Sequence, residues 1–146
     1  MPCGMCGRCG EWMISLDTNV VLSALNPEDV HHARARQLLT VHGATEALFL
    51  SPVVHAELMA SADAPGIWRF LQKAQITTLW EMPQAAWEAA GKGFGQYAEL
   101  RRRGVLPRRI LADFLIAAHA QHHGLGVMSF DGTVYTAVFP GLRLIQ

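Results

Sequence analysis

The segment that most constrains the fold is a short apolar run that ends in a lone acid. Met13–Leu16 is followed at once by the polar triplet Asp17–Asn19, after which the chain becomes apolar again. A run of this length is typical of a buried strand, and open α/β sheets build their sites at the carboxyl ends of such strands. We therefore predict that a strand delivers Asp17 to the edge of a sheet.

The rest of the chain alternates between strand-like and helix-like segments. Asn26-Pro27 and Ser51-Pro52 each pair an N-cap residue with a proline at the first helical position. The predicted strands are 13–17, 47–51, 76–79, 126–129 and 142–145, and the predicted helices are about 26–41, 52–60, 67–74, 83–103 and 110–123. This alternation predicts the α/β class, with a mainly parallel sheet of about five strands covered on both faces.

Length and composition fit one domain. With 146 residues, 51% of them hydrophobic, the chain has a substantial core to bury. We place the domain at residues 13–146 and expect residues 1–12 to be a disordered, Gly-rich extension. This extension carries all three cysteines, Cys3, Cys6 and Cys9, and the alternative is that they bind a metal. Zinc and iron–sulfur sites usually take four protein ligands, and the chain has only three cysteines, so we favour an extension that binds no metal.

Charge and hydropathy exclude several classes. The net charge is zero, so any attraction to nucleic acid must be local. No apolar run approaches the roughly 18–20 residues that span a bilayer, and the N-terminus lacks the order of a signal peptide. We therefore expect a soluble, cytoplasmic protein without a membrane partner.

Four acids stand alone in or beside apolar segments: Asp17, Glu57, Asp113 and Asp131. Burying a carboxylate is costly unless it is paired, hydrogen-bonded or bound to a metal. In the predicted sheet, strand carboxyl ends and the starts of the following helices lie along one edge. All four acids are therefore expected to face one pocket.

Such a cluster favours a divalent metal. Several carboxylates without nitrogen or sulfur ligands suit a hard ion, Mg²⁺ or Mn²⁺, and these ions commonly act on phosphate esters. Thr18, Asn19 and Ser129 are candidates to orient the substrate or the water shell of the metal. The alternative is that Asp17 and Asp113 only cap helices, but that interpretation leaves Glu57 unexplained.

Four segments together resemble the PIN-domain nucleases, and most closely the VapC-type toxins of bacterial toxin–antitoxin pairs. They are Ser15–Leu22, Ser51–Leu58, Ala112–Ala120 and Gly124–Asp131, in the order and at about the spacing of that family, and Phe139–Ile145 resembles its last strand. The resemblance covers the chain from about Met13 to its end. Residues 1–12 have no counterpart in the family.

The resemblance implies a three-layer α/β/α fold and a ribonuclease dependent on Mg²⁺ or Mn²⁺. Asp17, Glu57 and Asp113 match the most constant acids of the family's metal site, and Asp131 matches a more variable fourth acid. Ser129 stands where a threonine is usual and keeps the hydroxyl group.

The resemblance also implies partners: an RNA substrate, an antitoxin that occupies the active-site groove, and a second copy in a homodimer. Val20–Leu25 and the tryptophans Trp68, Trp80 and Trp87 are candidates for these surfaces. The interpretation that each belongs to the core is favoured.

Weaker signals are basic and imidazole side chains. Arg108 and Arg109 stand at a helix start, where the macrodipole disfavours them, next to the expected pocket, and this position favours contacts with RNA phosphates over a solvated loop. His119 and His123 have a spacing that can bind metal, but we favour surface histidines near a helix end.

Two other functions are compatible with the sequence. One is a PIN-like binding or scaffold module with little catalysis, and the four acids argue against it. The other is a metal-dependent phosphatase acting on small phosphate esters. Phosphatases of the haloacid dehalogenase type have Asp-x-Asp after the first strand, whereas this chain has Asp17-Thr-Asn19, which argues against that type.

Overall fold

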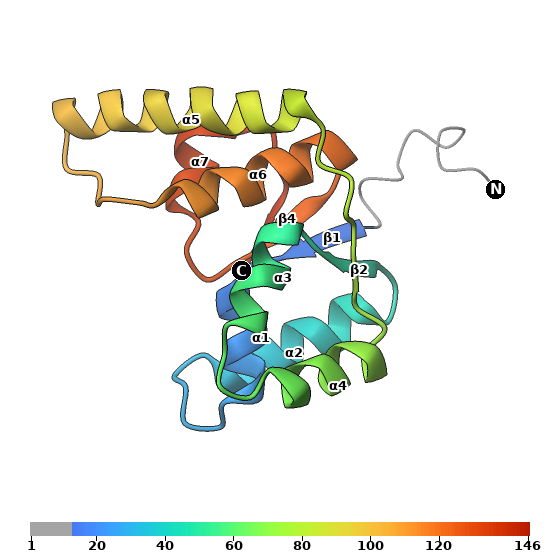
Figure 1. Ribbon diagram of the computed structural model, residues 1–146. Coiled ribbons are helices and arrows are strands. Elements are labelled where there is room, and N and C mark those ends of the chain that lie inside the picture. The colour runs from blue at the N-terminus through green and yellow to red at the C-terminus, as the bar shows by residue number, and fades with distance from the viewer. Residues whose placement is uncertain (1–12) are drawn as a thin grey trace.

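Five parallel strands form one sheet in a computed structural model that describes residues 13–146. The order is β3-β2-β1-β4-β5, and every neighbouring pair is parallel (Figure 1). The strands are β1 (Met13–Leu16), β2 (Ala47–Leu50), β3 (Thr77–Thr78), β4 (Gly126–Met128) and β5 (Leu144–Ile145). The predicted α/β class with a five-stranded parallel sheet is confirmed. The expected disordered extension at 1–12 and its cysteines lie outside the described residues.

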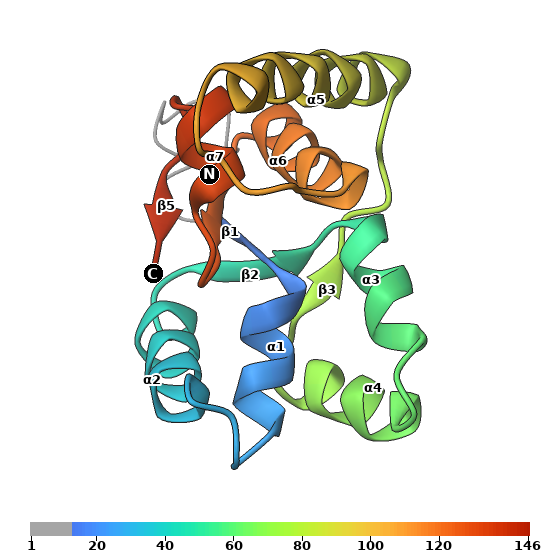
Figure 2. The same ribbon diagram turned by 90° about the vertical axis from the view of Figure 1, so that its left-hand side faces the viewer.

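Seven helices in the described part of the chain complete a three-layer α/β/α arrangement. They are α1 (Thr18–Leu25), α2 (His32–Gly43), α3 (Pro52–Met59), α4 (Ala64–Lys73), α5 (Gln84–Arg103), α6 (Leu111–His123) and α7 (Thr133–Val138). Figure 2 shows α5, α6 and α7 on one side of the sheet and α1, α2 and α4 on the other. Helix α3 contacts helices of both groups. Among residues 13–146, no helix combines the length and apolarity that crossing a lipid bilayer requires.

The first strand runs directly into a helix. Asp17 is the N-cap of α1, and its side chain accepts a hydrogen bond from the N–H of Thr18. The predicted start of the helix at residue 26 is therefore wrong. Asn26 ends α1, and its side chain accepts a bond from the N–H of Glu28, which closes a turn before α2. The Asn-Pro pair marks a turn here because the preceding residues already satisfy their bonds within a helix.

The predicted cap at the start of α3 is confirmed. Ser51 Oγ accepts a hydrogen bond of 3.2 Å from the N–H of Val54, and Pro52 follows in the first turn. Helix α4 begins three residues before the predicted position, because Asp63 caps it by accepting from the N–H of Gly66 at 3.2 Å. These caps fix where each helix leaves the sheet edge.

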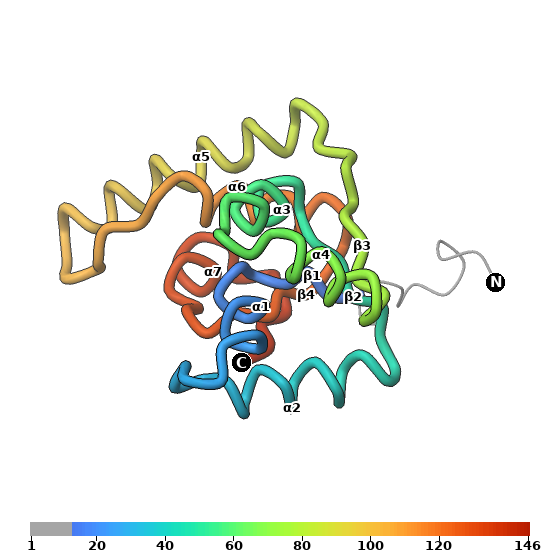
Figure 3. The backbone as a smooth tube through the Cα atoms, turned by 60° about the horizontal axis from the view of Figure 1, so that its bottom comes forward, coloured from blue at the N-terminus to red at the C-terminus, as the bar shows by residue number. Residues whose placement is uncertain are grey.

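Helices α5 and α6 run alongside each other (Figure 3). Gly93 of α5 allows the ring of Phe139, which follows α7, to pack closely against α5, since a Cβ atom at Gly93 would lie 2.8 Å from that ring. Phe114 and Ile116 of α6 are fully buried between α5 and the sheet side of the domain. This packing holds the first turn of α6, which carries Asp113, in a fixed place.

Several side chains differ from the sequence interpretation in their exposure. Trp68, Trp80 and Trp87 are 45%, 63% and 52% exposed, so their assignment to the core is wrong. His119 is fully buried, so its assignment to the surface is also wrong. Its ring is accommodated because Nε2 donates to the main-chain oxygen of Leu79 at 2.8 Å. A hydrogen bond of this kind lets an imidazole sit inside a core.

Candidate active site

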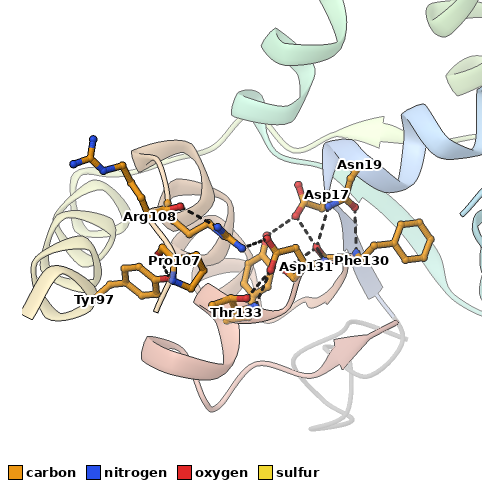
Figure 4. A network of polar contacts seen from close by, with 11 residues as sticks. Asp17, Asn19, Tyr97, Pro107, Arg108, Phe130, Asp131 and Thr133 are labelled. Carbon is orange, nitrogen blue, oxygen red and sulfur yellow. Dashed lines mark hydrogen bonds and ion pairs between the residues drawn. The ribbon is translucent and has the colours of Figure 1, made fainter. Parts of the chain in front are cut away.

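The candidate site lies at the carboxyl edge of the sheet, between β1 and β4 (Figure 4). Asp17 follows β1, Asp131 follows the neighbouring strand β4, and Asp113 lies in the first turn of α6. We call these three aspartates, together with Glu57 of α3, the acid site. Its members come from four segments that are far apart in sequence.

Asp17 is the most buried member, with only 7% of its surface exposed. It accepts three hydrogen bonds: from the N–H of Thr18 at 2.8 Å, from Ser129 Oγ at 2.8 Å and from the hydroxyl of Tyr135 at 2.9 Å. Burial raises the pKa of Asp17, and the three hydrogen bonds oppose that rise. The carboxylate is therefore held in one orientation at the end of β1.

Ser129 and Asn19 organise the chain where β4 ends. Ser129 Oγ accepts a hydrogen bond from the N–H of Asp131 at 3.1 Å, while it donates to Asp17. Asn19 Oδ1 accepts from the N–H of Phe130 at 3.2 Å, and its amide nitrogen lies 3.4 Å from Ser129 Oγ. Both side chains thus hold the main chain of residues 130–131 in place beside Asp17.

Asp131 is held from two sides. Its Oδ1 accepts hydrogen bonds from the N–H and the hydroxyl of Thr133, at 3.1 Å and 2.7 Å. Its Oδ2 forms an ion pair of 2.7 Å with the guanidinium of Arg109. Although burial acts to raise the pKa of Asp131, the bonds from Thr133 and the charge of Arg109 lower it below its usual value. Asp131 is therefore a carboxylate at neutral pH.

The surroundings of Asp113 raise its pKa. Its pKa is raised from 3.8 to about 6, first by burial, then by the negative charges of Asp17 and Asp131. A hydrogen bond to the main chain at Ile110 and the charge of Arg109 reduce this rise without cancelling it. The negative charges of Asp17 and Asp131 therefore act on Asp113 at this edge of the sheet.

Glu57 joins the cluster indirectly. Its carboxylate is exposed and accepts a hydrogen bond of 2.9 Å from Thr18 Oγ1. Thr18 also donates its main-chain N–H to Asp17, so one residue links the two acids. Among residues 13–146, no three members of the acid site place their oxygen atoms within 4.8 Å of one another. The cluster is therefore open toward solvent on the Glu57 side.

The donor chemistry fits a hard divalent ion. Every candidate ligand is a carboxylate oxygen, which is the ligand type that Mg²⁺ and Mn²⁺ prefer. Burial first, and then the charges of Asp17 and Asp131, raise the pKa of Asp113, and the charge of Arg109 does not cancel that rise. A cation that binds there would relieve this repulsion.

Of the two arginines singled out in the sequence, only Arg109 touches an acid. Arg108 is exposed and lines a hollow of about 430 Å³ between α5 and the start of α6, together with Arg101 and Arg109. The connection that carries them is anchored by Tyr97, whose hydroxyl donates to the main-chain oxygen of Pro107 at 2.5 Å. Arg109 thus connects this arginine-lined hollow to Asp131.

The sequence interpretation missed Tyr135 and Thr133. Both belong to α7, a helix of six residues that was not predicted. Tyr135 is nearly fully buried, and its pKa is raised well above 10, first by burial and then by the charge of Asp17. The signal for it was a lone tyrosine two residues after Thr133, in a segment rich in β-branched residues. Such residues have low helix propensity, so the segment does not indicate a helix.

The fold and site together define an α/β/α domain with an acidic centre at the carboxyl edge of its sheet, and the comparisons place it in a family. The family model described as PIN domain matches residues 14–138, so the chain belongs to the PIN domain family. A search of curated proteins gave no match.

Solved structures share the fold. VapBC2 from Rickettsia felis, bound to a DNA fragment from its promoter, matches with a TM-score of 0.62 and 17% identity, covering 90% of this chain and 96% of that one. FitAcB from Neisseria gonorrhoeae matches with a TM-score of 0.61 and 21% identity, covering 92% and 97%. VapC20 from Mycobacterium tuberculosis, described as a Sarcin-Ricin loop cleaving toxin, matches with a TM-score of 0.54 and 17% identity, covering 85% and 94%.

Proposed function

We propose that this protein is a metal-dependent endoribonuclease that hydrolyses RNA phosphodiester bonds, and that it is the toxin of a toxin–antitoxin pair. Membership of the PIN domain family supports a nuclease. The observation that carries the proposal is the gathering of three aspartates at one sheet edge, where burial and then the charges of Asp17 and Asp131 raise the pKa of Asp113 to about 6. The structural neighbours from toxin–antitoxin complexes support the pairing with an antitoxin.

Asp17, Glu57, Asp113 and Asp131 are the residues that would hold Mg²⁺ or Mn²⁺. When bound, such an ion polarises a phosphoryl oxygen and makes a water molecule nucleophilic at neutral pH. Asp17 is held in one orientation by its three hydrogen bonds. The most buried candidate ligand, Asp17, therefore needs little reorganisation when a metal binds.

Thr18, Asn19 and Ser129 support this site. Thr18 orients Glu57 through its hydroxyl, and Asn19 and Ser129 fix the chain that leads to Asp131. These bonds hold the acids at the positions from which they act. In this proposal the three residues are positioning residues, since their described polar contacts are with the protein itself.

Arg108 and Arg109 are proposed to contact the RNA backbone. They line the hollow of about 430 Å³, and the ion pair of Arg109 with Asp131 joins that hollow to the acid site, where a phosphate would bind. Guanidinium groups bind phosphate oxygens in a bidentate manner, and such contacts position the strand without reading its sequence.

The proposed partners are an antitoxin and a second copy of this chain, in the cytoplasm. The exposed tryptophans Trp68, Trp80 and Trp87 are apolar surface that such partners would cover. Leu22 of α1 is also exposed, whereas Val20 and Val21 beside it are buried in the core.

The test is cleavage of a mixed RNA panel with Mg²⁺ or Mn²⁺ by the wild type, Asp17→Asn and Asp113→Asn. We expect cleavage by the wild type and loss of it with EDTA or with either substitution. Glu28→Gln is the matched control, since it removes the same charge at an exposed acid and leaves the acid site intact. Cleavage by the variants equal to that of the wild type would refute the proposal.

A second assay on the same proteins separates the alternatives. Hydrolysis of p-nitrophenyl phosphate without RNA cleavage would identify a phosphatase of small phosphate esters. A folded wild type that does neither, but binds RNA or a protein partner, would identify a binding or scaffold module.

A further inference from the structure

A second group of metal-binding side chains lies at the other end of α6 from the acid site. Glu81, His122 and His123 each place one ligand atom within 4.8 Å of the others. They are the only group of three or more such residues that is this close among residues 13–146. His122 and His123 belong to the last turn of α6, and Glu81 belongs to the connection between β3 and α5.

Two imidazole rings at this end of α6 are anchored on that connection. His123 Nε2 donates to the main-chain oxygen of Glu81 at 2.8 Å, and His119 Nε2 donates to that of Leu79 at 2.8 Å. A carbonyl oxygen only accepts, so each Nε2 must carry the proton and each Nδ1 keeps its lone pair. Metal-binding histidines are typically held in this way, with the second ring nitrogen bonded to a carbonyl.

The surroundings of these histidines favour a bound cation. His119 lies against His123, with ring centroids 4.5 Å apart, and its buried Nδ1 has no hydrogen-bond partner among the described residues. The carbonyl end of a helix carries partial negative charge, which attracts cations. The end of α6 therefore places negative potential beside the imidazole nitrogens that would bind a metal.

We propose that Glu81, His122 and His123 form a Zn²⁺ site that clamps the C-terminal end of α6 to the connection between β3 and α5. Two imidazoles and one carboxylate, completed by water, are a ligand set that Zn²⁺ takes in a tetrahedral geometry. Glu81 and His122 are exposed, so their side chains can rotate to close the distance to about 2.0–2.2 Å from the ion. This site is separate from the acid site, which has only oxygen ligands.

The experiment is calorimetric titration of the full chain with ZnCl₂, after removal of any polyhistidine tag and with Cys3, Cys6 and Cys9 changed to serine. We expect one Zn²⁺ per chain in excess MgCl₂, which keeps the acid site occupied. His122→Ala and His123→Ala are expected to weaken binding at least about tenfold. Gln121→Ala removes an exposed side chain from the same turn and is expected to change nothing.

Two further variants keep the result decisive. Asp17→Asn combined with Asp113→Asn removes acid-site ligands and is expected to leave this Zn²⁺ binding intact. Glu81→Gln alters a ligand without touching α6, so it tests the site even if a histidine variant folds poorly by circular dichroism. The proposal is overturned if the wild type takes up no Zn²⁺, if binding survives Glu81→Gln and both histidine substitutions, or if only the double aspartate variant loses it.

Discussion

Removal of the charge at Asp113 is expected to stabilise the metal-free protein. In the folded state the pKa of Asp113 is about 6, against 3.8 without the fold. The folded state therefore holds a proton more tightly than the unfolded state, so this residue favours folding below about pH 4 and loses that advantage as the pH rises through 6. Asp113→Asn keeps the shape of the side chain without the charge. The variant should therefore not lose this stability as the pH rises.

The size of the effect follows from the two pKa values. The difference between 3.8 and about 6 corresponds to roughly 3 kcal/mol at pH 8. Because the side chain is half-buried and partly screened by water, we expect about 1.5–3 kcal/mol of added stability. At pH 4 the two proteins should differ by much less, since the carboxyl group of the wild type is then largely protonated.

The assay is urea unfolding in EDTA at pH 4, 6 and 8, with Glu28→Gln as the exposed control that should stay within about 0.5 kcal/mol of the wild type. Added Mn²⁺ should then stabilise the wild type more than Asp113→Asn, because the ion relieves the same repulsion. A variant that is less stable than the wild type at pH 8 in EDTA, or a difference independent of pH, would refute the electrostatic reasoning.

Three further predictions concern single side chains. Tyr135→Phe removes one of three hydrogen bonds to a buried carboxylate and should cost about 1.5–3 kcal/mol of stability at pH 8, measured by urea unfolding. Arg109→Gln should weaken RNA binding and raise the pKa of Asp131, observable by NMR titration of the carboxyl group, whereas Arg102→Gln on exposed α5 should do neither. Gly93→Ala places a methyl group against a buried aromatic ring and should lower stability by about 1–3 kcal/mol in thermal unfolding, with Gly91→Ala in open space as its control.

The sheet and most helices were predictable because each has a local signal. The apolar runs of β1, β2 and β4 and the proline-marked start of α3 are short-range features that the fold keeps. The start of α1 was not predicted because its N-cap is Asp17, the one residue that lies between β1 and α1. No linker separates them, and the sequence alone does not show that the acid serves both.

The acids of the site were predictable, but their partners were not. A lone carboxylate in an apolar segment is visible in the sequence, as Asp113 and Asp17 show. The donors to Asp17 come from Ser129 and Tyr135, more than a hundred residues later, and depend on tertiary packing. The same holds for His119, whose burial depends on the carbonyl of Leu79 on a distant segment.

The distance along the chain between Asp17 and its partners has a consequence during synthesis. Ser129 and Tyr135 follow Asp17 by 112 and 118 positions, so they are the last of the three residues to be added. At about 5–20 residues per second, the ribosome needs roughly 6–24 seconds to pass from the first to the last of them. During this time Asp17 has left the ribosome without the groups that orient it. A site built this way is complete only when almost the whole chain has been synthesised.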